Sequence, residues 1–209
     1  MRVRRGVRSI LVSLVTGAPC AGAPPKRTHR LQTSTQSSGG ASTPVARPEF
    51  PVTRVGIGYD SHRFVTGRPL ILGGVRVPHS QGLAGHSDAD AVAHALTDAI
   101  LGAAAAGNIG QLFPDTDPRW SGADSLKLLR AAYDVVRDRG YVLAQADLTI
   151  IAEQPKLGPY LASMADALAA TLGIAAAEIG MKAKTNEGMG FIGRGEGIAV
   201  IAVATLEAR

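Results

Sequence analysis

Residues 198–206, IAVIAVATL, are apolar at both odd and even positions. Successive side chains of a strand point to opposite faces, so a strand with this sequence needs both of its faces buried. The helices expected over 88–106, 123–139 and 159–172 can cover only one face of a small sheet. We therefore expect an α+β fold, with a mixed β-sheet and helices on one face. Self-association is the most economical way to cover the other face.

Further strands and loops are expected around these helices. Short apolar or β-branched segments between turn signals predict strands over 52–59, 148–154 and 178–185, and a hairpin over 70–79 around Gly73-Gly74. Loops are expected over 108–122, which contains two prolines, and over 186–197, which is rich in glycine. No internal repeat interrupts this order of elements.

Charge divides the chain into two parts. Of its 22 Lys and Arg residues, eight lie in 1–48, where there is no Asp or Glu. The remainder is mildly acidic, which argues against a nucleic-acid partner for the globular part. The single cysteine, Cys20, excludes an intrachain disulfide, and no apolar run approaches the roughly 18 residues that span a membrane. We interpret 1–51 as a disordered or targeting extension and 52–209 as one domain.

The beginning of the chain allows several interpretations. MRVRRGVRS, followed by ILVSLV and APCAGA, has the outline of a weak signal peptide, and its acid-free, Arg- and Ser-rich composition also fits an organelle transit peptide. A disordered extension, or an upstream start that is not used, is the simpler interpretation because Gly17 and Pro19 interrupt the apolar stretch. The expected location is cytoplasmic in a bacterium, or a plastid if this segment is a transit peptide.

A carboxylate and an imidazole follow the first expected strand, in the segment GIGYDSHRF (56–64). Asp60 and His62 are two positions apart, so in an extended chain they share a face and could bind one metal ion. Two solvated or hydrogen-bonded polar residues at a strand end are the simpler alternative. A third ligand would favour the metal.

A polar stripe on the first expected helix offers that third ligand. Asp90, His94 and Asp98 are spaced by four residues and share one face of a helix otherwise rich in apolar residues. His94 could bind the metal, and an Asp one turn away could orient its ring. His86 precedes the helix, where a helix start can bind anions. We assign His94 to the metal and His86 to phosphate, although the two roles could be exchanged.

Two loops carry further candidates. Asp115 and Asp117 lie in the loop FPDTDP, where turn-building is their usual role. The segment KTNEGMGFIGRGEG (184–197) gathers Lys184, Thr185, Glu187, Arg194 and Glu196 on a glycine-rich backbone. Amides, a hydroxyl and a Lys suit phosphate, and a lone Glu suits a hard cation such as Mg²⁺, although a plain glycine-rich turn is an equal alternative.

These residues indicate a small metal-dependent enzyme that acts on a phosphorylated compound. No serine or cysteine nucleophile motif is visible, which favours phosphoryl transfer positioned by ligands. One alternative is a non-catalytic, metal-stabilised trimer whose basic tail binds an anionic polymer. Another is a metal-dependent phosphohydrolase that uses the same ligands.

Five segments, in order, carry a resemblance to a known family. They are RVGIGYDSHRF, LGGVRVPHSQGLAGHSDADAVAHALTDAILGAAAAGNIGQLFPDTDP, GADS, LTIIAEQPK and KTNEGMGFIGRGEGIAV. Over about residues 53–207 the chain resembles the 2-C-methyl-D-erythritol 2,4-cyclodiphosphate synthases of the non-mevalonate isoprenoid pathway. The resemblance implies an enzyme that cyclises 4-diphosphocytidyl-2-C-methyl-D-erythritol 2-phosphate and releases CMP, without a protein nucleophile.

The resemblance also implies two metal ions and an assembly. Asp60, His62 and His94 match the family's zinc ligands, with one Zn²⁺ per subunit. Glu187 matches the ligand of a Mg²⁺ or Mn²⁺ ion between the α- and β-phosphates. The implied assembly is a homotrimer, with the sheets packed at its centre and the active sites between subunits.

The implied substrate contacts spread over several segments. His86 and Thr185 match residues that steady the transition state, so they are the implied catalytic residues. The implied cytosine pocket is 152–158, and the loop 113–117 faces the methylerythritol. The implied substrate-binding residues are Asp60, His62, His86, Ser87, Asn108, Ile109, Gly110, Phe113, Pro114, Asp115, Thr116, Asp117, Ala152, Lys156, Leu157, Gly158, Lys184, Thr185, Asn186, Glu187, Phe191 and Arg194.

Three features depart from the family pattern. Asn108 replaces the usual Asp of a GDIG motif, so an acceptor for the ribose hydroxyls remains but a charge is lost. Gly158 stands where a larger apolar residue can occur, which loosens one wall of the base pocket. The extension of about fifty residues has a counterpart in plastid members and none in the bacterial pattern.

Overall fold

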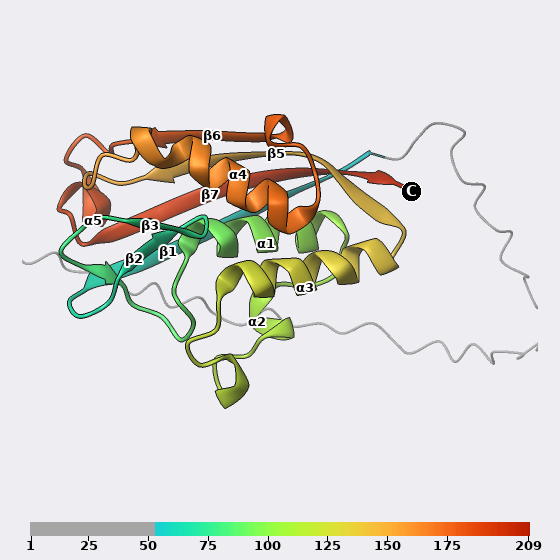
Figure 1. The fold of residues 1–209 in the computed structure, drawn as a ribbon, viewed down its shortest axis with the longest axis horizontal. Helices are drawn as coiled ribbons and strands as arrows, with labels where there is room; N and C mark the ends of the chain where they lie inside the picture. The colour runs from blue at the N-terminus through green and yellow to red at the C-terminus, as the bar shows by residue number, and fades with distance from the viewer. Residues whose placement is uncertain (1–52) are drawn as a thin grey trace, which may run out of the picture. The chain divides into compact units, whose positions relative to one another are not determined.

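A five-stranded mixed sheet lies at the centre of the structure, a computed structural model that describes residues 53–209 (Figure 1). The strand order is β4-β1-β7-β5-β6, and all neighbours are antiparallel except β5 and β6. The strands are β1 (Thr53–Val65), β4 (Gly82–Leu83), β5 (Tyr141–Ile151), β6 (Ile179–Lys184) and β7 (Gly197–Ala208). The extension expected over 1–51 lies outside the described residues.

Three helices cover one face of the sheet, as the sequence predicted (Figure 1). They are α1 (Ala91–Ala103), α3 (Ser125–Asp138) and α4 (Leu161–Leu172). A separate hairpin pairs β2 (Leu70–Leu72) with β3 (Val75–Val77). The connections contain short helical turns: α2 (Ile109–Leu112), α5 (Gly190–Gly193), η1 (Pro118–Trp120), η2 (Gly158–Tyr160) and η3 (Ala176–Glu178).

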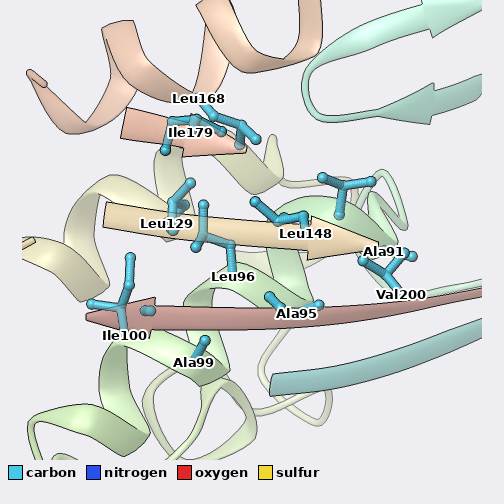
Figure 2. Packing of buried hydrophobic residues seen from close by; sticks show 14 of the residues in the cluster. Ala91, Ala95, Leu96, Ala99, Ile100, Leu129, Leu148, Leu168, Ile179 and Val200 are labelled. Atoms are coloured by element: carbon cyan, nitrogen blue, oxygen red, sulfur yellow. The ribbon is translucent and has the colours of Figure 1, made fainter. Parts of the chain in front are cut away.

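The core fills the space between this face and the helices (Figure 2). Aliphatic side chains from α1, β5 and β7, such as Leu96, Leu148 and Val200, are fully buried there. On the side of β6, Leu168 of α4 lies next to Ile179 in the same cluster (Figure 2). Alanine, valine, isoleucine and leucine therefore build most of the core, in keeping with the low aromatic content of 4%.

Helix α1 lies directly on β1, because two glycines of the strand leave room for its backbone. A Cβ placed on Gly58 would lie 1.9 Å from the carbonyl oxygen of Ala95, and one on Gly56 would lie 2.1 Å from that of Ala99. Both are backbone atoms, which no rotamer change can move away. The close approach also brings Asp60 and His62 of β1 within reach of α1.

We expect Gly58→Ala to destabilise the domain by about 3 kcal/mol or more, because overpacking against a helix backbone forces the two elements apart. Urea denaturation followed by circular dichroism would measure the change. The matched control is Gly102→Ala, since a Cβ there would meet its nearest atom at 3.9 Å. Alanine is the better helix former, so the control should be neutral or slightly stabilising. Equal stabilities of the two variants would contradict this account.

The opposite face of the sheet is open within one chain, and part of it is apolar. Val55, Ile57 and Tyr59 of β1 are 65%, 70% and 56% exposed, and Ile201 and Val203 of β7 are each 36% exposed. The alternate positions of β7, from Ile198 to Leu206, face the helices and are buried. The pattern of IAVIAVATL is thus satisfied on one face only, and the second face lacks a cover from the described part of the chain.

Two strands differ in extent from the sequence prediction. Strand β1 continues to Val65, so Asp60 and His62 lie within a paired strand and not at its end. Strand β5 begins at Tyr141, seven residues before the expected start. Residues 60–63 of β1 and the added part of β5 pair with β7, and Phe64 and Val65 of β1 pair with β4. Among the described residues, no helix is long and apolar enough to cross a membrane.

Candidate metal centre and active site

Three side chains from two elements meet at one point. Asp60 and His62 project from the helix-facing side of β1, and His94 projects from α1. Asp60 Oδ2 lies 2.9 Å from His62 Nε2 and 3.2 Å from His94 Nδ1, and the two imidazole nitrogens are 3.3 Å apart. Ligand atoms about 2 Å from a tetrahedral ion lie about 3.3 Å from one another. The spacing therefore fits a small divalent cation bound by all three residues.

The proton on His62 supports the same interpretation. His62 Nδ1 lies 2.5 Å from the carbonyl oxygen of Ala84, which can only accept, so Nδ1 carries the ring N–H. In the neutral ring, Nε2 then presents a lone pair toward Asp60 and His94. Lone pairs and a carboxylate at these distances repel one another unless a positive charge lies between them. The cluster of Asp60, His62 and His94 is therefore suited to a metal ion.

The pKa values in this cluster show the same demand for positive charge. Burial opposes ionisation of Asp60, but hydrogen bonds and charge from His62 and His94 hold its pKa well below the usual range. Burial favours the neutral form of His62, yet the hydrogen bond and charge of Asp60 outweigh it and raise the pKa. A proton on His62 would compete with a metal ion, so metal binding should weaken as the pH falls.

The acidic neighbours of His94 on its helix form no hydrogen bond with its ring. Asp90 is the N-cap of α1, and its buried carboxylate accepts from the backbone N–H groups of Gly73, Gly74, Val92 and Ala93. Asp98 accepts from Ile109 N–H at 2.7 Å and so fixes the start of α2. The ring of His94 is met instead by the hydroxyl groups of Ser87 and Ser125.

A pocket of about 460 Å³ opens beside the metal cluster. His86 is exposed at its edge, with Nε2 3.3 Å from the carbonyl oxygen of Asp117, and Ser87 is nearly buried, with its hydroxyl directed toward His94. Most of the predicted ribose and methylerythritol contacts border the same pocket. Its lining is His62, Ala84, Gly85, His86, Ser87, His94, Ile109, Gly110, Phe113, Pro114, Asp115, Trp120 and Leu128.

A second pocket, of about 360 Å³, collects the residues predicted to bind cytosine. It is built by the segment after β5 and by the end of β6. Its lining is Ala152, Pro155, Lys156, Leu157, Gly158, Pro159, Leu161, Ala183, Lys184 and Thr185. The two pockets share no lining residue, so a single chain does not bring the predicted cytosine pocket and the metal cluster into one cavity.

The loop after β6 holds Thr185 and Glu187 side by side. Thr185 Oγ1 donates to Glu187 Oε1 at 2.6 Å, and the Glu187 side chain is exposed. Glu187 has a φ of +52°, in the left-handed region. Glu153 anchors this turn, because its Oε1 accepts from the backbone N–H groups of Asn186 at 2.9 Å and Gly188 at 3.2 Å.

The other predicted residues lie outside these two pockets. Asn108 is the N-cap of α2, and its Oδ1 accepts from Gln111 N–H at 3.0 Å. Asp117 pairs with Arg119 at 2.6 Å, which lowers the pKa of the Asp117 carboxyl. Thr116 lines neither pocket. Phe191 is 41% exposed and Arg194 pairs with Glu196 at 2.6 Å, both near the start of β7 and away from both pockets.

Sequence reasoning missed three residues with clear roles around the site. Glu153 was included as part of a strand and of the implied cytosine pocket, Ser125 as part of a helix and of the GADS segment, and Trp120 as part of a loop, but none of them was given a role of its own. In the pocket wall, the Trp120 ring stands edge-on to the Phe113 ring, with the two ring centroids 5.0 Å apart. The buried indole N–H of Trp120 has no hydrogen-bond partner among the described residues. For Trp120 the sequence offered one signal, the residue type itself, because a tryptophan side chain is rarely left fully exposed in a turn.

Known proteins match this domain along its whole length. A model of the YgbB family matches residues 53–207. A 2-C-methyl-D-erythritol 2,4-cyclodiphosphate synthase from Symbiobacterium thermophilum is 53% identical over 155 residues, 74% of this chain and 99% of that protein. These matches define the class of the domain as the cyclodiphosphate synthases.

Solved structures agree. A CDP-bound 2C-methyl-D-erythritol-2,4-cyclodiphosphate synthase superposes with a TM-score of 0.68 and 44% identity, covering 73% of this chain and 99% of the other. The bifunctional IspDF from Campylobacter jejuni gives a TM-score of 0.74 at 44% identity, covering 77% of this chain and 43% of that longer one. The chain belongs to the YgbB family of 2-C-methyl-D-erythritol 2,4-cyclodiphosphate synthases.

Proposed function

We propose that residues 52–209 form a catalytic domain that converts 4-diphosphocytidyl-2-C-methyl-D-erythritol 2-phosphate to 2-C-methyl-D-erythritol 2,4-cyclodiphosphate. An oxygen of the 2-phosphate attacks the β-phosphorus, and the bond from that phosphorus to the oxygen bridging it to the α-phosphorus breaks, so CMP leaves. Both reacting phosphates belong to one molecule, so positioning supplies much of the rate. The observation that carries the proposal is the cluster of Asp60, His62 and His94 beside a pocket, in a chain 53% identical to a named synthase.

Two cations fit the donors that the chain offers. Asp60, His62 and His94 are the oxygen and nitrogen donors that Zn²⁺ prefers, and three protein ligands leave a fourth position for a phosphate oxygen. The exposed Glu187 carboxylate suits Mg²⁺ or Mn²⁺ shared with phosphate oxygens and water. Such cations neutralise phosphate charge and make the β-phosphorus more electrophilic.

The side chains around the pocket would hold the substrate in its reactive arrangement. His86, exposed at the pocket edge, would donate to a phosphate oxygen. Thr185 can turn its hydroxyl from Glu187 to a phosphate once a cation engages that carboxylate. Lys156 and the backbone around Leu157 border the second pocket, where the cytosine would bind. The apolar wall around Phe113 would exclude water from the reacting phosphates.

We further propose a homotrimer with each active site between two subunits. The open face of β1 and β7 exposes Val55, Ile57 and Tyr59 at alternate positions of one strand. A second copy of the chain could cover this surface, which lowers the cost of exposing it. The two halves of the predicted site occupy separate pockets of one chain, and a neighbouring subunit could bring the second half to the first.

Product analysis tests the reaction directly. The purified domain, given the cytidine-linked substrate and divalent metal, should release CMP in step with loss of substrate and produce no inorganic phosphate. A phosphohydrolase that removes the 2-phosphate would release inorganic phosphate instead, and one that attacks the diphosphate with water would release CMP with a linear bisphosphate, so the second product must be the cyclic diphosphate. Release of inorganic phosphate without CMP would therefore show that the domain catalyses hydrolysis and not cyclisation.

The Glu187→Gln variant tests the second cation. Glutamine keeps the shape of the side chain but weakens its binding of a hard cation, so most activity should be lost at low Mg²⁺ and partly restored at high Mg²⁺. Bound zinc should stay at the wild-type level. The matched control is Glu178→Gln, because Glu178 lies in η3 and borders neither pocket. A Mg²⁺ dependence equal to that of the wild type would reject Glu187 as a ligand.

A further inference from the structure

The ring nitrogen of His94 that faces away from the metal cluster has two hydroxyl neighbours. Its Nδ1 faces Asp60 and His62, and its Nε2 lies 2.9 Å from Ser125 Oγ and 3.2 Å from Ser87 Oγ. Ser125 is the first residue of α3 and is only 1% exposed. Ser125, which is distant in the sequence, therefore contacts the His94 ring on the side opposite the metal cluster.

The direction of these hydrogen bonds follows from the ligand role of His94. If Nδ1 offers its lone pair to a cation, the ring N–H lies on Nε2 and donates to Ser125 Oγ. The hydroxyl of Ser125 is then free to donate onward. Its acceptor is the Oδ1 atom of Asp88, at short hydrogen-bonding distance.

Asp88 also fixes the backbone that carries Ser125. Its Oδ2 accepts from Ser125 N–H at 3.1 Å, and its own N–H donates to the carbonyl oxygen of Ala123 at 3.0 Å. Next to this contact, Gly122 N–H donates to the carbonyl oxygen of His86 at 2.8 Å. The start of α3 is thus held against the segment that precedes α1. Ser87 Oγ also lies 3.3 Å from Ser125 Oγ, but the carboxylate of Asp88 is the nearer acceptor for the Ser125 hydroxyl.

We propose that Ser125 and Asp88 are positioning residues that orient His94 and strengthen its donation to the metal. The relay runs from His94 Nε2–H to Ser125 Oγ and from the Ser125 hydroxyl to the Asp88 carboxylate. A carboxylate at the end of such a chain locks the ring in the ligand orientation and makes Nδ1 more electron-rich. The relay presupposes the metal centre proposed above.

Zinc affinity of the isolated protein is the direct test, measured by competition with a chelator of known affinity. Ser125→Ala should weaken Zn²⁺ binding roughly 10- to 100-fold, the usual cost of losing a partner of a metal-bound histidine. Asp88→Asn, which is nearly isosteric, should weaken it about 10-fold by the same reasoning. The matched control is Asp124→Asn. Asp124 is the N-cap residue just before α3, and its carboxylate accepts from Leu126 N–H, so the zinc affinity of this variant should be unchanged.

A double-mutant cycle separates a relay from a general loss of structure. Because Asp88 acts through Ser125, adding Asp88→Asn to Ser125→Ala should change the zinc affinity less than about twofold. The melting temperature of each metal-free variant reports folding independently. If Ser125→Ala does not fold, Asp88→Asn alone still carries the prediction.

Several outcomes would overturn the relay. The first is a wild-type zinc affinity in Ser125→Ala or in Asp88→Asn. The second is a double variant whose loss of zinc affinity equals the product of the two single losses. The third is a loss of zinc affinity in Ser87→Ala with none in Ser125→Ala. The last result would assign the Nε2 proton to Ser87. Absence of zinc binding in the wild-type chain would instead remove the proposed metal centre itself, so the two failures are distinguishable.

Discussion

The His62→Ala variant is expected to lose zinc and activity together. His62 is one of three ligand candidates within 2.9–3.3 Å of one another, and among the described residues no other His, Cys, Asp or Glu joins this group to replace Nε2. Two remaining protein ligands leave a weak site. We expect zinc in the purified protein to fall below about a tenth of the wild-type content. CMP release should fall more than 100-fold, because loss of a ligand costs more than the roughly 10- to 100-fold loss of activity that follows when only a hydrogen-bond partner of a ligand is removed.

A second histidine provides the matched control. His79 belongs to the turn after β3, where its ring packs 5.0 Å from that of Phe64 and its Nδ1 lies 3.0 Å from the carbonyl oxygen of Gln81. His79→Ala should keep full zinc and nearly full activity. Elemental analysis that finds one zinc per subunit in His62→Ala, or an equal loss in both variants, would show that the cluster of Asp60, His62 and His94 is not the metal centre.

The sequence was most informative where chemistry depends on local spacing. Asp60 and His62 are two apart, and in a strand this spacing alone places both side chains on one face. The structure confirms the shared face, although the strand continues to Val65. The strand end was misplaced because most residues of DSHRF are polar. Along most of this segment β1 pairs with β7 on one side only, and such a strand tolerates polar residues that a fully buried strand would not.

Contacts between distant segments could not be derived from spacing. His94 was assigned to the metal from a helical stripe with Asp90 and Asp98, yet both carboxylates bond to backbone N–H groups and neither bonds to its ring. Asp90 was needed as a helix cap, a role that local sequence also allowed. The partner that the ring does meet, Ser125, is 31 residues away and becomes adjacent only when α3 packs on α1.

The two-sided apolar strand β7 gave the strongest long-range expectation. Its helix-facing side chains are buried as predicted, and its other side presents Ile201 and Val203, which stay partly exposed in one chain. Sequence can state that a face needs a cover, but it does not identify the cover. Assembly therefore remains a proposal, and it has a consequence for the active site that can be measured.

If each active site lies between neighbours, two inactive variants should restore activity when they are mixed. His62→Ala would destroy the metal cluster but keep the Thr185–Glu187 loop, and Glu187→Gln would do the reverse. In randomly mixed trimers, each site draws its metal cluster from one subunit and its loop from the next. About a quarter of the sites would then combine two intact halves, so about a quarter of wild-type activity should return.

The experiment requires dissociation and reassembly of equal amounts of the two variants, with native mass spectrometry to verify that mixed trimers have formed. Each variant carried alone through the same procedure is the control, and at the low Mg²⁺ concentration used for all of these assays it should lack most of its activity. If verified mixed trimers showed no rescue, both halves of each site would have to belong to one subunit. In that case no site in a mixed trimer combines an intact metal cluster with an intact loop. A monomeric mass for the active enzyme would refute the assembly itself, and the apolar face of β1 and β7 would then need another partner.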